Sequence, residues 1–418
     1  MNCDICIIGA GPAGLMAAIS AARAGAGTIL LESNTTAGRK LLKTGRGRCN
    51  LTHAGKSADV LKAYSPFTRF LRHSIYELSP EALREYFHDH NLATKVEKDG
   101  CVFPVTDRAT DVLRILLDDA RRAGVRFLYG RKAQSIDKPD GLFAIRTATD
   151  NIFAPAVVIA TGGVSWPHTG STGDGYRFAE FFGHTIVAPK PALVPLATEQ
   201  TCLHQLAGVE LSNVVISAVV ENVKVSASGP MIFTHEGIGG PAVYDFSREI
   251  TDFLSQTKQP LEIRIDMAPE YQKDQLDKHI IELCQQNPRK ELAGIMARLM
   301  PRALALDICG RLNSDGQILA SQLPKTKRRE LIDMIKQSGL TVIKTRPIEE
   351  ATITRGGVSV EQIDPRTMQS RVCPGLFFAG EVIDVDGPCG GYNLQIAFCT
   401  GRVAGREAAL LVKPSQRP

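Results

Sequence analysis

The chain has 418 residues, of which 44% are hydrophobic and 22% charged, and its formal net charge is +5. This length exceeds what one simple core organises, so we expect two or three domains. The modest positive charge suits anionic ligands but does not by itself indicate a nucleic-acid-binding protein. No apolar run approaches the roughly 18 residues of a membrane helix, so we expect no membrane partner.

The ten cysteines are scattered, and only Cys3 and Cys6 form a C-x-x-C pair. That pair opens an expected buried strand, where residues three apart face opposite sides. No second pair completes a metal site, so we expect no metal. We expect reduced, mostly buried thiols in a cytoplasmic protein. No signal peptide is expected, because the fold starts at residue 3 without a basic leader.

The start of the chain predicts a dinucleotide-binding turn. Residues 4–8 are typical of a buried parallel strand and lead directly into Gly9, Gly11 and Gly14. Gly9 permits a tight turn, Gly11 lets the backbone approach a pyrophosphate, and Gly14 lets helix and strand pack closely. The N–H groups of a helix starting here would face the phosphates.

The next residues complete a β-α-β unit. A helix is expected over residues 15–24 and a second strand over residues 28–31, and Glu32 follows 18 positions after Gly14. Glu32 can accept hydrogen bonds from ribose hydroxyls. The alternative is an ordinary glycine-rich turn, but strand, helix and acid all stand where the dinucleotide motif requires them.

Five basic residues fall within positions 39–48. Such a cluster can be a solvated basic loop or a nucleic-acid patch. Glycines interleave the charges, however, so backbone N–H groups can form an anion nest. The segment also follows the β-α-β unit, where a second part of a dinucleotide would lie.

Residues 64–130 indicate mixed α/β structure. Ser79 and Pro80 mark a helix start, and residues 107–123 form an amphipathic pattern. Residues 125–129 are expected to add a strand to the dinucleotide sheet, and residues 131–150 to form a small hairpin.

Three later stretches combine buried strands with small residues. Residues 156–163 end in Thr-Gly-Gly, residues 375–384 contain Gly380-Glu381, and residues 387–395 lead into a last helix over 396–411. Small residues let the backbone pass close to a cofactor. A helix N-terminus preceded by Gly-Gly can receive an anionic or carbonyl-bearing group.

The middle of the chain has a different character, beginning near Pro189. Residues 193–233 and 261–267 alternate like antiparallel strands, whereas residues 269–338 are helical and charged. The glycine-rich stretch 233–242, expected as a loop, carries the titratable His235. We therefore expect a dinucleotide domain from residues 1–190 and 353–418, an inserted β-rich domain from 191–268 and 339–352, and a helical domain over 269–338.

The glycine turn at residues 9–14, the Thr-Gly-Gly strand end and the Gly380-Glu381 strand end form a three-part layout that the insertion splits. Such a layout suits a long, extended cofactor, and FAD fits it better than NAD. The sequence closely resembles the YhiN/BaiN-like flavoproteins, FAD-dependent oxidoreductases of the glutathione-reductase/fumarate-reductase-like superfamily. The resemblance spans the whole chain and rests on residues 9–14, 38–52, 161–175, 233–242 and 380–395.

The resemblance implies an α/β fold with a Rossmann-like FAD-binding domain built from both chain ends, an inserted β-barrel-like domain and a helical domain. It also implies that Asn393 and Leu394 place backbone N–H groups at the pyrimidine end of the flavin, where negative charge builds on reduction. The chain departs from the family at His53, where Asn is usual, at Cys389, where Thr or Asn is usual, and at Trp166, where Tyr is frequent.

The resemblance also implies which residues line FAD, some within these motifs and some between them. They are Gly9, Gly11, Pro12, Ala13, Gly14, Glu32, Ser33, Gly38, Arg39, Lys40, Thr44, Gly45, Gly47, Arg48, Cys49, Asn50, Ala133, Ala160, Thr161, Gly162, Gly163, Asp174, Gly380, Glu381, Gly391, Asn393 and Leu394.

The resemblance further implies hydride transfer through the flavin to or from a small organic substrate. Reduction of an enone-type C=C bond with NAD(P)H as donor is the leading hypothesis, and an aminoacetone-like amine oxidase using O2 is an alternative. No second Gly-x-Gly-x-x-Gly follows a strand, so NAD(P)H would be a transient co-substrate without a domain of its own. Two alternatives are a tRNA-modifying flavoprotein and a non-catalytic flavin sensor. The first would require a basic stripe with exposed aromatic side chains, and the basic segment 286–338 contains no aromatic residue.

The reaction also needs a proton donor. The candidates are His235, Arg48 and Tyr392, with His168 as a further possibility. A redox disulfide between Cys49 and Cys389 is a weaker hypothesis, because the closely spaced pair of cysteines usual in such enzymes is missing after the first helix.

Overall fold

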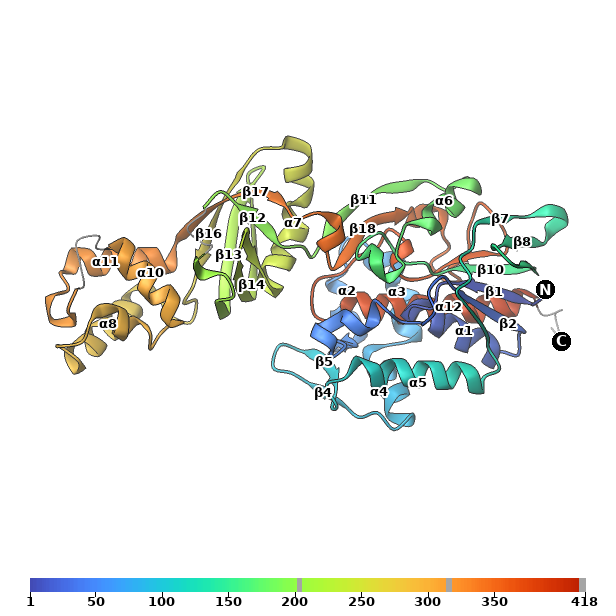
Figure 1. The fold of residues 1–418 in the computed structure, drawn as a ribbon, viewed down its shortest axis with the longest axis horizontal. Helices are drawn as coiled ribbons and strands as arrows, with labels where there is room; N and C mark the ends of the chain where they lie inside the picture. The colour runs from blue at the N-terminus through green and yellow to red at the C-terminus, as the bar shows by residue number, and fades with distance from the viewer. Residues whose placement is uncertain (201–204, 313–317, 413–418) are drawn as a thin grey trace. The chain divides into compact units, whose positions relative to one another are not determined.

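The computed structural model describes residues 1–200, 205–312 and 318–412. Three short segments lie outside the described residues: 201–204, 313–317 and 413–418. The first includes Cys202 and falls in a stretch expected as strand, the second falls in the expected helical domain, and the third is the C-terminal end. The chain divides into two compact units (Figure 1). Unit 1 comprises residues 1–191 and 352–418, and unit 2 comprises residues 192–351.

Unit 1 is built from both ends of the chain. Its elements are β1 (Ile5–Ile8), α1 (Pro12–Arg23), β2 (Thr28–Glu32), β3 (Thr52–His53), α2 (Ser57–Lys62), α3 (Thr68–Glu77), α4 (Pro80–Asp89), β4 (Thr94–Val96), β5 (Cys101–Pro104), α5 (Ala109–Arg122), β6 (Arg126–Tyr129), β7 (Ser135–Asp137), β8 (Phe143–Arg146), β9 (Asn151–Ala154), β10 (Ala156–Ile159), α6 (Asp174–Phe181), β11 (Ile186–Ala192), β18 (Ile353–Val358), β19 (Leu376–Phe378) and α12 (Tyr392–Val412).

The central sheet of unit 1 has five strands in the order β19-β10-β1-β2-β6. Every neighbouring pair is parallel. The strands β1 and β10 are buried along their whole length, which explains their unbroken apolar sequence, because a strand that is covered on both faces has no solvent-facing side chains.

Helices from opposite ends of the chain pack closely in this unit. The helices α1 and α12 lie side by side (Figure 1). A Cβ added at Gly401 would lie 2.3 Å from the carbonyl oxygen of Ala13, and one at Gly405 would lie 2.0 Å from that of Ala17. The glycines of α12 therefore admit the backbone of α1, which brings the C-terminal segment to the Gly9–Gly14 turn.

Unit 2 combines strands with a group of helices. Its elements are β12 (Leu196–Thr198), β13 (Glu210–Val220), β14 (Val223–Thr234), β15 (Gly237–Gly239), α7 (Pro241–Thr257), β16 (Leu261–Asp266), α8 (Lys273–Gln286), α9 (Leu292–Met296), α10 (Arg302–Leu312), α11 (Lys325–Lys336) and β17 (Ser338–Thr345). The strands close a barrel in the order β12-β15-β14-β13-β16-β17. One apolar cluster includes barrel residues such as Ile263 and helical residues such as Ile308.

The expected fold class is confirmed: a Rossmann-like α/β unit carries an inserted barrel and helices. Two details differ from the sequence expectations. Thr52–His53 forms β3, which pairs with β5, and two residues are too few for periodicity to reveal. Gly237–Gly239 forms a strand rather than a loop. A Cβ at Gly237 would lie 2.2 Å from the carbonyl oxygen of Leu196, so glycine is what allows that pairing.

Candidate FAD site

The Gly9–Gly14 turn follows β1, and its three glycines lie in different surroundings. A Cβ added at Gly9, where φ is +104°, would lie 2.5 Å from the carbonyl oxygen of Ala160, and one at Gly14 would lie 1.8 Å from that of Gly9. These two glycines are required by the fold itself. A Cβ at Gly11 would meet no described protein atom within 4 Å. The open space at Gly11, beside the start of α1 at Pro12, is where a pyrophosphate would meet the helix N-terminus.

Glu32 ends β2 and is only 8% exposed. Its carboxylate accepts hydrogen bonds from Ala10 N at 2.9 Å, from Asn34 N and Nδ2 at 2.8 Å each, and from Ser33 Oγ at 3.2 Å. These bonds fix the acid at the edge of the sheet, where a ribose is expected. They also bring in Asn34, which the motif did not indicate and whose Oδ1 accepts from Arg39 Nη1 at 2.5 Å.

The glycine-rich basic segment contains an unusual run of backbone conformations. Positive φ angles occur at Gly45, Arg46, Gly47 and Cys49, and such conformations turn successive N–H groups to one side. Thr44 contributes a carbonyl that accepts from Cys49 N at 3.0 Å. The run supports the expected nest of backbone donors in this segment.

Arg48 is held by two carboxylates. Its Nη1 lies 2.7 Å from Glu97 Oε1 and 3.6 Å from Asp107 Oδ1, and its guanidinium lies 3.9 Å from the centre of the Phe103 ring. The hydrogen bond to Glu97 is the main reason why the pKa of Arg48 is raised further. Arg48 is therefore a permanent cation, suited to holding an anionic group rather than to donating a proton.

Lys40 and Glu381 form an ion pair that joins the two ends of the chain. Lys40 Nζ lies 2.7 Å from Glu381 Oε2, and each side chain is 22% exposed. Ser165 Oγ, which accepts from Lys40 at 2.7 Å, donates to Glu381 Oε1 at 3.0 Å, and Thr354 N donates to the same oxygen at 2.8 Å. Thr354 Oγ1 in turn accepts from the backbone N–H groups of Val164 and Ser165. This network connects three of the motifs, residues 38–52, 161–175 and 380–395, with β18. Ser165 and Thr354 were not predicted as site residues.

The Thr-Gly-Gly segment after β10 is closely packed. Ala160 is 5% exposed and contacts the Gly9 turn, and a Cβ at Gly163 would lie 2.4 Å from Thr354 Oγ1. Thr161 Oγ1 is buried and finds no hydrogen-bond partner among the described residues. Gly162 adopts φ +75°.

Other predicted residues surround these segments. A Cβ at Gly38 would lie 2.5 Å from Leu113 Cδ1, so Gly38 packs against α5. Ala133 is 4% exposed. Asp174, at the start of α6, pairs with Lys132 at 2.9 Å and with Arg177 at 3.6 Å. Gly380 adopts φ +74° beside Ala13.

The N-terminus of α12 is fixed by side chains. Asn393 Oδ1 accepts from Gly387 N at 2.9 Å, and its Nδ2 donates to Gly387 O at 2.8 Å and to Pro388 O at 3.2 Å. Gln395 N, bonded to Gly391 O, closes the first helical turn. Within that turn the N–H groups of Asn393 and Leu394 have no acceptor of their own helix and can serve a ligand.

Asn50 lies beside this helix start. A Cβ at Gly391 would lie 2.8 Å from Asn50 Oδ1, and this buried oxygen has no hydrogen-bond partner among the described residues. The isoalloxazine ring offers the matching groups, an N–H donor flanked by two carbonyl acceptors, for Asn50 Oδ1 and for the α12 N–H groups. Together with the open space at Gly11, these features fit FAD.

Cys49 and Cys101, two buried cysteines of unit 1, form no disulfide within the described residues. Burial raises the pKa of Cys49 to about 12 and is also the main reason why that of Cys101 is about 12. Both are therefore uncharged thiols at neutral pH, which weakens the hypothesis of a redox disulfide at Cys49.

The three candidate proton donors occupy different settings. Tyr392 stacks on His53, with ring centres 4.7 Å apart. Arg48 lies among carboxylates, as described above. His235 belongs to unit 2, where its exposed side chain lies in the turn between β14 and β15, next to Glu236, which pairs with Arg346. His168, the further possibility, is exposed and contacts the Trp166 ring.

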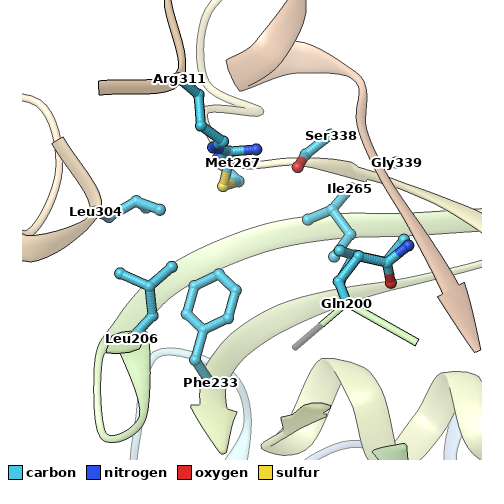
Figure 2. A pocket seen from close by; sticks show the side chains of 10 residues that line it. Gln200, Leu206, Phe233, Ile265, Met267, Leu304, Arg311, Ser338 and Gly339 are labelled. Atoms are coloured by element: carbon cyan, nitrogen blue, oxygen red, sulfur yellow. The ribbon is translucent and has the colours of Figure 1, made fainter. Parts of the chain in front are cut away.

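A cavity in unit 2 is too small to serve as a substrate site (Figure 2). Its wall includes Phe233, Ile265, Leu304 and Leu340, with Arg311 at its edge. The four apolar side chains are 4%, 1%, 1% and 5% exposed, so they offer a ligand almost no surface. None of the residues predicted for FAD lines this cavity.

Two further kinds of feature are absent from residues 1–200, 205–312 and 318–412. No group of three or more potential metal-ligating side chains comes together there. No helix of that part is both long and apolar enough to cross a membrane.

Comparisons with known proteins agree with this geometry. The family model described as the HI0933-like protein Rossmann domain matches residues 3–407. A 3-dehydro-bile acid delta(4,6)-reductase of Clostridium scindens is 34% identical over 96% of this chain and 98% of its own. A ribosomal RNA dihydrouridine synthase of Escherichia coli is 30% identical over 97% of each chain.

The fold also recurs in a solved structure of low sequence identity. A 3-ketosteroid delta1-dehydrogenase of Sterolibacterium denitrificans superposes with a TM-score of 0.53 at 13% identity, covering 98% of this chain and 100% of its own. At that identity the likeness concerns the fold alone. The match over nearly the whole chain and the full-length relatives place this protein in the HI0933-like Rossmann family of FAD-dependent oxidoreductases.

Proposed function

We propose that the protein reduces a carbon–carbon double bond conjugated to a carbonyl group in a small organic molecule, with NAD(P)H as the electron donor. The observation that carries the proposal is the full-length similarity, at 34% identity, to a reductase of a 3-dehydro-bile acid. The second relative bears on the same chemistry, because forming dihydrouridine also saturates a ring C=C bond conjugated to a carbonyl.

The residues of unit 1 have distinct parts in this proposal. When bound, FAD supplies the hydride chemistry. The first turn of α12 and Asn50 Oδ1 would hold the pyrimidine end, where the helix N-terminus favours negative charge. Gly11 and the start of α1 would bind the pyrophosphate, and the Lys40–Glu381 pair would keep the two chain ends in register around it.

Proton delivery divides the three candidates by chemistry. Arg48 stays charged, so its part would be to attract an anionic group of substrate or donor. Tyr392 and His235 carry exchangeable protons and would be the donors to the substrate carbon. Replacing each separately, as Y392F and H235N, tests them. The proton donor is the one whose loss slows product formation while reduction of the flavin by NAD(P)H keeps its rate.

An anaerobic titration tests the central proposal. The purified protein should show a flavin spectrum that bleaches with NADH or NADPH and recovers when a steroid-type enone is added. If the flavin spectrum does not change with either nucleotide but bleaches with aminoacetone and recovers with O2, the amine-oxidase alternative is correct. A protein that binds no flavin even after addition of FAD would contradict the family role itself.

A second candidate substrate is a uracil base within RNA, and one feature of unit 2 favours it. Residues 286–338 contain ten basic and five acidic residues, an excess equal to the net charge of the whole chain. Arg289, Arg298, Arg302 and Arg329 are exposed, and positive charge without base contacts gives salt-dependent binding to phosphates. Turnover of ribosomal RNA, lost in an R298E/R302E variant that still reduces enones, would select this candidate.

A further inference from the structure

We propose that His53 is a positioning residue that fixes the N-terminal turn of α12 for flavin binding. The inference rests on the FAD site proposed above and adds the means by which the chain holds that turn in place. Its basis is the way β3 meets the loop before α12.

The imidazole of His53 is enclosed on two sides. A Cβ added at Gly100 would lie 2.4 Å from His53 Nε2, so only glycine leaves room for the ring there. On another side the ring stacks on Tyr392, with 4.7 Å between ring centres and 18° between planes. The pairing of β3 with β5, in which His53 stands opposite Cys101, fixes the backbone that carries the ring.

The ring makes one directed contact with the loop. His53 Nδ1 lies 3.2 Å from the carbonyl oxygen of Gly390. A carbonyl oxygen only accepts, so Nδ1 must carry the hydrogen that forms this bond. Gly390 adopts φ +114° and Gly391 φ +97°. Glycines leave such a loop conformationally free. The bond from His53 restrains this loop at the carbonyl group of Gly390, two residues before α12 begins.

The neighbouring residue of β3 holds the helix itself. Thr52 Oγ1 donates to Gln395 Oε1 at 2.7 Å, and Gln395 Nε2 donates to Leu78 O at 2.6 Å. Both bonds are buried. A Cβ at Gly391 would lie 2.3 Å from Thr52 O, so strand and loop are in direct contact. Thr52 and His53 thus hold the helix turn and its preceding loop from one short strand.

The consequence concerns ligand binding rather than folding alone. The turn that β3 holds contains the N–H groups of Asn393 and Leu394, the donors proposed for the flavin. Donors that must be ordered at the moment of binding bind more weakly than donors already in place. Loss of the His53 bond should therefore weaken FAD binding more than it lowers the stability of the apoprotein.

Two substitutions separate the hydrogen bond from the stacking. H53N keeps an N–H donor on Cγ, where Nδ1 is attached in histidine, but removes the ring. H53F keeps a ring against Tyr392 and removes the donor. We expect H53F to weaken FAD binding about five- to tenfold, the effect of one hydrogen bond, and H53N to stay within about threefold of the native chain. The dissociation constant is read from quenching of flavin fluorescence.

Unit 2 offers a matched control. His279 stacks on Tyr271 with 5.5 Å between ring centres and 13° between planes, and neither residue belongs to the proposed site. H279F should leave the FAD dissociation constant unchanged. Thermal unfolding of each apoprotein and the visible spectrum of each bound flavin distinguish a displaced turn from a general loss of stability.

The outcomes decide between the inference and its rivals. Equal FAD affinity of H53F and the native chain would overturn it, as would an H53N variant as weak as H53F. If H53F does not fold, H53L removes the same donor with a smaller side chain, and native FAD affinity in that variant would overturn the inference too. Failure of the native chain to bind FAD would instead refute the proposed cofactor site.

Discussion

Alanine at Gly11 and alanine at Gly14 should differ in their effect on the stability of the apoprotein. Gly11 has φ −79° and ψ −177°, which any residue adopts, and a Cβ there meets nothing within 4 Å. G11A should therefore leave the apoprotein as stable as before, or stabilise it by about 0.4–1 kcal/mol. It should weaken FAD binding at least about tenfold, or about 1.4 kcal/mol, because the methyl group takes the space expected for the pyrophosphate.

Gly14 is the matched control for that experiment. Its added Cβ would lie 1.8 Å from the carbonyl oxygen of Gly9, so helix and strand would have to separate. Overpacking of this kind costs about 1–3 kcal/mol, and G14A should lower the stability of the apoprotein accordingly.

Both variants can be followed with the same two measurements. Urea unfolding read by fluorescence reports on unit 1, because the single tryptophan of the chain, Trp166, lies there. FAD titration gives the affinity. A G11A variant with native FAD affinity would refute the placement of the pyrophosphate at this turn.

Two further predictions concern buried groups. The first uses a double-mutant cycle with K40M and E381Q, followed by urea unfolding. Because each side chain is 22% exposed, the coupling energy should be about 1–2 kcal/mol, between that of exposed and fully buried pairs. A coupling energy near zero would contradict the network. Burial raises the pKa of Cys49 from 9.0 to about 12, so the unfolded chain releases this proton first and stability should fall as pH rises from 9 towards 12. C49A should lose less stability over that range, and native Cys49 should resist iodoacetamide at pH 8; rapid labelling would show that the thiol is accessible.

The fold was predictable where a local rule dictates the sequence. The buried strands β1 and β10 are apolar along their whole length because both faces of the sheet are covered. Gly9 and Gly14 could be recognised because a backbone approach forbids any side chain. Alternation predicted strands in unit 2, but neither their order nor their closure into a barrel, because pairing between distant strands leaves no local signal.

The side-chain network of the site was harder to predict. Lys40 and Glu381 each stand in a recognisable motif, yet their pairing across 341 positions follows only from the folded chain. Ser165 lies in a bend and Thr354 lies in β18, and small polar residues at such positions need not serve a ligand. What marks them is their shared contact with Glu381, which no spacing along the sequence could show.

The same distinction explains why β3 matters more than its two residues suggest. A glycine-rich approach to a helix start is flexible by itself, and within residues 387–395 the Asn393 side chain ties the loop to the helix. Further contacts come from elsewhere in the sequence, from His53 on Gly390 and Thr52 on Gln395. A motif search finds the groups proposed to contact the flavin, while the residues that set their position must be read from the structure.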